Sequence, residues 1–289
     1  MAGALASPRA RPSVLRLGGH VLDCTFRAIV MGVLNRTPDS FYDRGATFAL
    51  DDLLRRAEQL VADGADVLDV GGVKAGPGDE VTEGEELDRV VPAIAELASR
   101  FDVPISVDTW RAEVAAAAYS AGAVLGNDIS GFADPRYLEA AAAAGASVVA
   151  THIRLAPRVR DPDPTYPRGD VVAAVESMLA DRLARALGAG IDADRVVLDA
   201  GLDLGKTPEQ SLELLRASDR LADIGPPLLL SASNKTFLGA LLGLEIHERR
   251  EASLAAVALG VTRGCRVVRV HDVAGTRRVV DVLAEVLAA

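Results

Sequence analysis

Eight short β-rich runs alternate with Ala- and Leu-rich stretches of helical periodicity from residue 27 to the end of the chain. The runs cover residues 28–34, 66–70, 104–108, 124–128, 147–152, 195–199, 227–231 and 266–271. Strands that are almost continuously apolar are typical of parallel sheets whose two faces are both buried, and a helix after each strand supplies the cover. The count of eight predicts a closed (β/α)8 TIM barrel of the α/β class, and a doubly wound open sheet is the alternative.

Three segments stand outside this alternation. Residues 14–24 place two glycines between short apolar runs, which predicts a hairpin that plugs the bottom of the barrel. We expect residues 1–12 to be a disordered tail, so that residues 13–289 form a single barrel domain. The segment 154–170 follows the fifth strand and holds four of the 14 prolines. A loop of this length is either functional or disordered.

The composition of the chain limits the classes of ligand and partner that it can bind. The net charge of −10 repels nucleic acid and anionic membrane surfaces, so an anionic ligand requires local positive groups. Cys24 and Cys265 lie far apart and show neither zinc-site nor disulfide-framework spacing. No apolar stretch has the length of a signal peptide or of a membrane span. We therefore expect a cytoplasmic protein that binds a small molecule and has no nucleic-acid or membrane partner.

Polar residues follow every predicted strand. In a barrel of this class the site lies at the carboxyl ends of the strands. The residues there are Asn35, Asp69, Asp108, Asn127, Asp128, His152, Asp199, Ser233, Lys235, Arg269 and His271. For Asp69 and Asp128, capping a helix or accepting from loop amides is an equal alternative.

Two subsets of these residues indicate chemistry. Two carboxylates, a carboxamide and an ammonium can read the donor and acceptor edge of a flat heterocycle, with structural ion pairing as the competing interpretation. They are Asp108, Asn127, Asp199 and Lys235. Arg269 and His271 alternate along the last strand and so point to the same side, which favours an anion such as phosphate. A salt bridge from Arg269 to a neighbouring aspartate is the alternative.

The stretch after the sixth strand, GLDLGKTPEQ, contains Gly-Lys-Thr but lacks the first glycine of a phosphate-binding P-loop. We therefore predict structural roles for both polar residues. Lys206 would organise the loop, and Thr207 would cap the helix that follows.

Seven motifs occur in the order expected of the dihydropteroate synthase family, which the chain resembles from residue 28 to its end. They are MGVLNRTPDSFYDRG, LDVGG, ISVDTWRAEVA, AGAVLGNDISG, LDAGLDLGKT, SNKTFLG and RVHDV. The resemblance implies a TIM barrel, usually a homodimer, that joins 6-hydroxymethyl-dihydropterin diphosphate to p-aminobenzoate, with Mg2+ accompanying the diphosphate.

The resemblance also assigns roles by motif. Asp108, Asn127, Asp199 and Lys235 resemble the residues that hold the pterin. Asn35, Arg269 and His271 resemble the diphosphate site, with Asn35 at the magnesium. Asp43 matches a catalytic carboxylate of the first loop and Asp39 its helper, and Lys235 belongs to the same catalytic group. These assignments agree with what the residue types alone indicate at the strand ends.

The second loop departs from the family pattern Gly-Gly-Glu-Ser-Thr-Arg-Pro. Here the corresponding residues are Gly71-Gly72-Val73-Lys74-Ala75-Gly76-Pro77, so Ala75 and Gly76 stand where the family has a hydroxyl and a guanidinium. Asn234 replaces the arginine of Ser-Arg-Lys. Losing an arginine that contacts a carboxylate substrate or orders a loop costs roughly 10²–10³ in rate.

Several functions fit this pattern. We favour a diverged relative that keeps the residues expected to hold the pterin and has lost or weakened the condensation. We call these residues, Asp108, Asn127, Asp199 and Lys235 with their supporting contacts, the pterin floor. Such a protein resembles the inactive second synthase copy of some actinobacteria. An active synthase in which Arg36, Arg44 or Lys74 supplies the missing cation is the alternative. A third hypothesis is a pterin-binding or anion-binding protein without turnover. A corrinoid-dependent methyltransferase shares pterin contacts, but TPDSF and RVHDV favour the synthase side.

Overall fold

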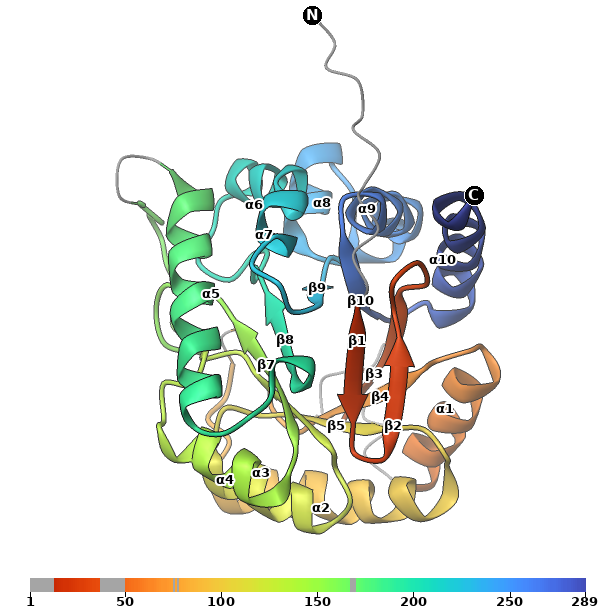
Figure 1. Cartoon of the computed structure of the whole chain (residues 1–289), viewed down its shortest axis with the longest axis vertical. Helices are drawn as coiled ribbons and strands as arrows, with labels where there is room; N and C mark the ends of the chain where they lie inside the picture. The colour runs from red at the N-terminus through yellow and green to blue at the C-terminus, as the bar shows by residue number, and fades with distance from the viewer. Residues whose placement is uncertain (1–12, 37–49, 75, 77, 167–169) are drawn as a thin grey trace, which may run out of the picture.

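The computed structural model describes residues 13–36, 50–74, 76, 78–166 and 170–289. Eight parallel strands close into a barrel in the order β10-β3-β4-β5-β6-β7-β8-β9 (Figure 1). Their bounds are β3 Ile29–Asn35, β4 Val67–Gly71, β5 Ile105–Asp108, β6 Leu125–Asp128, β7 Ser147–Thr151, β8 Val196–Asp199, β9 Leu228–Leu230 and β10 Cys265–Val270. The predicted TIM barrel is confirmed, and every predicted strand end lies within one residue of the observed one.

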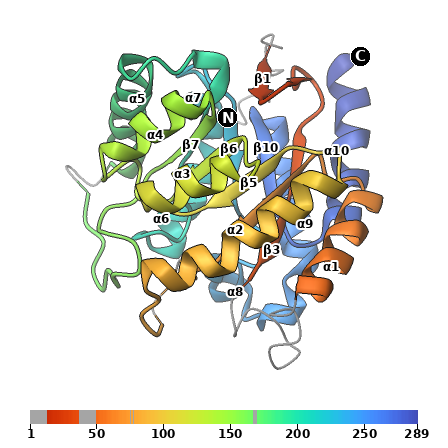
Figure 2. The same ribbon diagram turned by 90° about the horizontal axis from the view of Figure 1, so that it is seen from below.

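Helices surround the barrel and connect the strands (Figures 1 and 2). They are α1 Leu50–Ala62, α2 Glu83–Arg100, α3 Ala112–Ser120, α4 Arg136–Ala144, α5 Val171–Gly188, α6 Pro208–Arg216, α7 Ser218–Ala222, α8 Thr236–Leu242, α9 Arg250–Thr262 and α10 Val273–Ala288, with short 3-10 turns η3 Ala193–Arg195 and η4 Ile246–Glu248. Side chains define several of the helix starts. Thr82 and Glu85 form a capping box at α2, and Asp170 accepts a 2.8 Å hydrogen bond from the Ala173 amide at α5.

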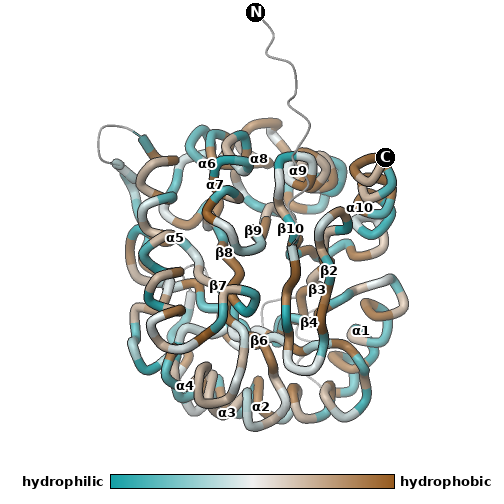
Figure 3. The backbone as a smooth tube through the Cα atoms, in the orientation of Figure 1, coloured by the Kyte–Doolittle hydropathy of each residue, from teal (hydrophilic) through white to brown (hydrophobic). Residues whose placement is uncertain are grey.

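Two apolar cores follow from the alternation of side chains along the strands. The larger one lies between the outer face of the barrel and the helices. The smaller one fills the barrel interior and includes Met31, Val149 and Val267. Figure 3 shows the apolar character running along the strands, with polar residues on the outer turns of the helices.

An antiparallel hairpin closes one end of the barrel. Strands β1 Val14–Leu17 and β2 His20–Asp23 pair in register, with Leu17 opposite His20. Leu15 and Leu17 are buried in the interior core, and Ser147, the first residue of β7, donates a hydrogen bond to the Arg16 carbonyl. The two ribbon views place the hairpin at the end opposite the loops that follow the strands (Figure 2). The predicted plug is therefore confirmed.

Among the described residues, none forms a helix with both the length and the apolar character that crossing a bilayer requires.

Candidate functional site

A buried carboxylate on β4 organises the barrel mouth. Asp69 is 0% exposed and accepts hydrogen bonds from three side chains on three other strands. Ser106 Oγ lies 2.5 Å away, Asn127 Nδ2 3.1 Å and Arg269 Nε 2.6 Å. A buried charge is tolerated only when it is paired and hydrogen-bonded, and Asp69 meets both conditions. This network fixes the side chains of β5, β6 and β10 relative to one another.

Arg269 joins Asp69 to a second carboxylate. Its Nη2 donates to Asp108 Oδ2 at 2.6 Å, while Nε is used by Asp69, so Nη1 is the donor nitrogen left over. Burial raises the pKa of Asp108 to about 7, Arg269 opposes this shift, and the nearby Asp69 carboxylate adds to it. Two carboxylates sharing one guanidinium in a dry site explain the direction. The salt-bridge alternative for Arg269 is thus what the structure shows.

The remaining predicted floor residues lie at the ends of β8 and β9. Asp199 is buried, accepts a 2.8 Å hydrogen bond from the Gly201 amide, and has its pKa raised by burial. Lys235 precedes α8, and burial lowers the pKa of its ammonium against the attraction of Asp203, Asp199 and Asp108. Within the described residues the ammonium has no hydrogen-bond acceptor, which suits it to donate to a ligand.

Asn35 and His271 lie at the same mouth. A Cβ added at Gly71 would come within 3.5 Å of both Asn35 Oδ1 and Asp108 Cβ, so the glycine gives these side chains room to approach. His271 follows β10, and its Nδ1 lies 2.9 Å from Ser233 Oγ. Partial desolvation in the mouth and the cations Arg269, Lys235 and Arg56 lower the pKa of His271.

The β8–α6 loop confirms the two structural roles predicted for it. Lys206 Nζ donates to the carbonyls of Gly201 at 2.8 Å and Leu204 at 3.0 Å, and burial lowers its pKa to about 7. Thr207 forms a capping box with Gln210 at the start of α6. Neither side chain has the geometry of a phosphate-binding P-loop.

The described part of the altered second loop reaches the surface. Lys74 and Gly76 are exposed, and a Cβ added at Gly76 would meet no described atom within 4 Å. Arg158, on the β7–α5 loop, donates to the Asp79 carbonyl beyond it. Asp39, Asp43 and Ala75 lie outside the described residues, as does Arg44.

Asn234 and Arg36 are both held by local contacts. Asn234 has φ 59°, a left-handed conformation that asparagine adopts more readily than arginine, and its carbonyl accepts from Arg249 Nη1 at 3.0 Å. The Arg36 Nη1 donates to the Arg89 carbonyl on α2, and its Nε is buried without a partner among the described residues. The Arg36 amide donates to the Gly71 carbonyl at 2.7 Å, so the residue lies beside the start of the second loop while its guanidinium is directed to α2.

The sequence left capping and function as equal alternatives for Asp128 and Asp69, and the structure gives the two residues different roles. Asp128 accepts from the amides of Ser130 at 2.7 Å and Phe132 at 2.9 Å, so the loop-capping interpretation holds for it. Asp69 is the hub of the mouth instead. Ser106 also belongs to this hub and was missed by the sequence analysis. The available signal was a polar side chain inside a strand that is otherwise apolar.

These features define a class: a (β/α)8 barrel with a polar small-molecule site at the carboxyl ends of its strands. The family model for pterin binding enzymes matches residues 31–271. A protein of Mycobacterium leprae named inactive dihydropteroate synthase 2 is 48% identical over 90% of this chain and 91% of its own. The dihydropteroate synthase of Bacillus subtilis is 38% identical over 90% and 89%.

Solved structures agree with the sequence relatives. A crystal structure of Yersinia pestis dihydropteroate synthase with a sulfonamide drug complex superposes with a TM-score of 0.89 at 37% identity, covering 95% of this chain and 99% of that one. The chain belongs to the dihydropteroate synthase family of pterin-binding enzymes.

Proposed function

We propose that this protein binds a pterin at the barrel mouth and has lost, or retains only weakly, the condensation of dihydropterin diphosphate with p-aminobenzoate. One contrast carries the proposal. The floor is a satisfied network around Asp69, whereas the second loop presents an exposed glycine at the position of the family's arginine. The similarity to a relative named inactive supports the same conclusion.

The floor residues have chemistry that suits a pterin. Carboxylates of Asp108 and Asp199 accept from ring N–H and amino groups, and the Asn127 carboxamide both donates and accepts. Lys235 supplies a donor for a ring carbonyl. Because Asp108 has a raised pKa, it is also able to carry a proton and donate near neutral pH.

The anion of the diphosphate would lie beside Arg269, His271 and Asn35. Arg269 keeps Nη1 available after its two ion pairs, and this position suits an oxygen of a leaving diphosphate. Asp43, helped by Asp39, is the proposed loop carboxylate for a developing pterin cation. In our proposal the weak point is the second substrate, since its carboxylate meets no arginine at residue 76.

Magnesium is a further part of the proposal. Within the described residues, no group of three or more His, Cys, Asp and Glu side chains could hold a metal ion. Mg2+ usually keeps several waters and takes only one or two protein oxygens beside substrate phosphates. The Asn35 carboxamide oxygen fits that limited demand, so Asn35 would hold the ion together with the diphosphate. Bound there, Mg2+ would neutralise charge on the leaving group.

The active-synthase alternative depends on a replacement cation. Arg36 donates to the Arg89 carbonyl, and burial together with Arg89 lowers the pKa of its guanidinium. Recruiting it to the second loop would break that contact with α2. This observation favours the weakened synthase over the version that relies on Arg36.

A homodimer and a cytoplasmic location complete the proposal. The last helices expose large apolar side chains, among them Leu241, Leu242, Leu259, Val282 and Val286, which a second copy would cover. Both cysteines are free and buried, in keeping with a reducing compartment.

A direct assay tests the function. Purified protein, Mg2+, dihydropterin diphosphate and labelled p-aminobenzoate are incubated beside a standard synthase, and dihydropteroate is measured. We expect product formation at least about 10²-fold below the control, together with pterin binding in calorimetry. A rate near the control would refute the loss of condensation. Absence of any pterin affinity would refute the retained floor.

A further inference from the structure

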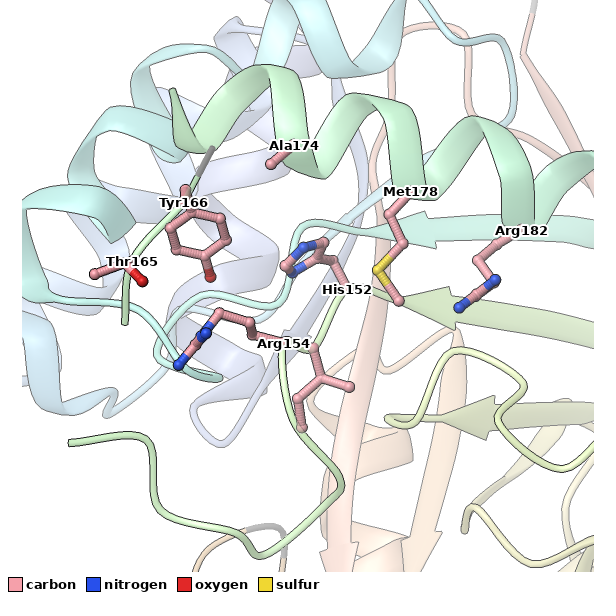
Figure 4. Close-up of a pocket in the computed structure, with 8 residues that line it drawn as sticks. His152, Arg154, Thr165, Tyr166, Ala174, Met178 and Arg182 are labelled. Carbon is pink, nitrogen blue, oxygen red and sulfur yellow. The ribbon is translucent and has the colours of Figure 1, made fainter. Parts of the chain in front are cut away.

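A second cavity lies behind strand β7, on the outer side of the barrel. Its volume is about 710 Å³, within the range of small-molecule sites. Helix α5 forms one wall with Ala174, Met178 and Arg182, and the end of β7 with its loop forms the other (Figure 4). His152 follows β7 and lines it, but none of the residues assigned to the pterin or the diphosphate does. The cavity is therefore separate from the candidate pterin site.

His152 presents a hydrogen-bond donor to this cavity. The side chain is only 4% exposed and lines the cavity, where Figure 4 shows it facing α5. Its Nδ1 lies 3.0 Å from Lys206 Nζ, which also contacts the carbonyl oxygens of Gly201 at 2.8 Å, Leu204 at 3.0 Å and His152 itself at 3.3 Å. A charged ammonium has no lone pair and can only donate, so in this pair Nδ1 accepts and the ring proton lies on Nε2. Among the described residues, no acceptor contacts Nε2.

The charge of the cavity wall is positive. Arg154 forms a two-point ion pair with Asp161, which compensates its charge. In the part of the chain that the structure describes, Arg182 has one ion pair, with Asp181, its exposed neighbour on α5, and such a surface pair is weak. Its Nε is buried without a partner among the described residues. Within the described lining there is no acidic side chain. An anion would therefore be attracted rather than repelled.

The rest of the lining is apolar or aromatic. Met178 and Ala174 come from α5, and the ring of Tyr166 lies 6.0 Å from that of His152 at an interplanar angle of 39°. The Tyr166 hydroxyl donates to the Gly205 carbonyl at 2.6 Å, which holds this wall in place. Flat rings and a methionine favour a flat apolar ligand body. The geometry points to a second ligand site here, for a small aromatic carboxylate, with His152 Nε2 and Arg182 as the donors to the carboxylate.

Calorimetry of the full chain with 2-naphthoate tests this site, and uncharged 2-naphthamide is the matched ligand control. We expect one 2-naphthoate per chain and binding at least about 10-fold weaker for the amide. Ala174→Phe fills the cavity and should abolish binding. Ala180→Phe adds the same ring to an exposed position of α5 and should bind like the wild type. Arg182→Gln should weaken binding about 5- to 10-fold.

Three results would overturn the site. They are no 2-naphthoate binding by the wild type at millimolar ligand, undiminished binding by Ala174→Phe, and undiminished binding by Arg182→Gln. Thermal melting of each variant shows whether it is folded. If Ala174→Phe does not fold, Arg182→Gln and the amide decide the question, since neither alters the packing of α5 at residue 174.

Discussion

Asp69 on strand β4 and Gly76 in the loop after it are only a few residues apart, but they differ in how much of the structure depends on them. Asp69 is fully buried and joined to three other strands, so each of its partners depends on it. Gly76 is exposed and has no neighbour within 4 Å of an added Cβ. Changing the first region leaves buried charges unpaired, which is costly, whereas a side chain added at Gly76 meets no described neighbour. A synthase-like barrel can therefore lose its second-substrate loop and keep its pterin floor.

The largest effect is expected at the hub of the floor. Asp69→Ala leaves Arg269 and Asn127 without their shared acceptor, and removing one partner of a buried pair costs about 3–5 kcal/mol. Urea denaturation of the variant would measure this loss of unfolding free energy. Glu96→Ala is the control, because it removes an exposed ion pair with Arg100 and should cost less than about 0.5 kcal/mol. Equal losses in the two variants would remove the distinction between floor and surface.

Restoring the second loop should raise activity. Ala75→Thr, Gly76→Arg and Asn234→Arg together return the hydroxyl and guanidinium groups of the family pattern. We expect dihydropteroate formation to rise about 10- to 100-fold, since a positioned arginine stabilises a carboxylate substrate and orders the loop.

The same triple variant carrying Asp43→Ala is its control and should return to the background rate. If the triple variant gains nothing, the loop is not the origin of the weakness. The left-handed backbone at Asn234 would then be the first explanation to test for the missing gain, because arginine is strained there.

Much of the fold was readable from the chain because its signals are local. Each strand is an apolar run followed by a polar residue, and each run lies within one residue of an observed strand. Lys206 and Thr207 were predictable for the same reason, since a cap and its helix are neighbours in sequence. The hairpin also followed from two glycines between short apolar runs.

The site was less readable because its contacts join distant segments. Asp69 and Arg269 are 200 residues apart, and only barrel closure brings them to 2.6 Å. The sequence left Asp69 divided between capping and function, and Ser106 received no role although it lies within the ISVDTWRAEVA motif. Arg36 shows the opposite case. A free cation on the first loop was conceivable from sequence, but the fold directs it to the Arg89 carbonyl.

A pH profile sharpens the description of the floor. The pKa of Asp108 is about 7 in the folded protein, against about 4 for an unfolded aspartate. The folded state thus binds the proton more tightly, so this stabilisation is fully present below about pH 4 and is lost as pH rises to about 7. Relative to Asp108→Asn, the wild type should lose about 1 kcal/mol per pH unit between pH 5 and 7.

Urea denaturation at several pH values measures this difference. Asp134→Asn is the control, because Asp134 lies at the surface and its pKa is lowered by Arg136. Parallel profiles for the wild type and Asp108→Asn would show that Asp108 remains ionised throughout, held by Arg269.

The smallest effects are expected at two glycines, Gly71 at the end of β4 and Gly76 in the second loop. Gly76→Ala meets no neighbour and no positive φ, so it should stabilise the protein by about 0.4–1 kcal/mol through the unfolded chain and leave pterin binding unchanged. Gly71→Ala adds a methyl group 3.5 Å from Asn35 Oδ1 and Asp108 Cβ, which fits without a clash but occupies the floor. It should weaken pterin binding while the fold stays intact. Calorimetry and urea denaturation of both variants check this, and a loss of pterin affinity in Gly76→Ala would place the loop within the floor.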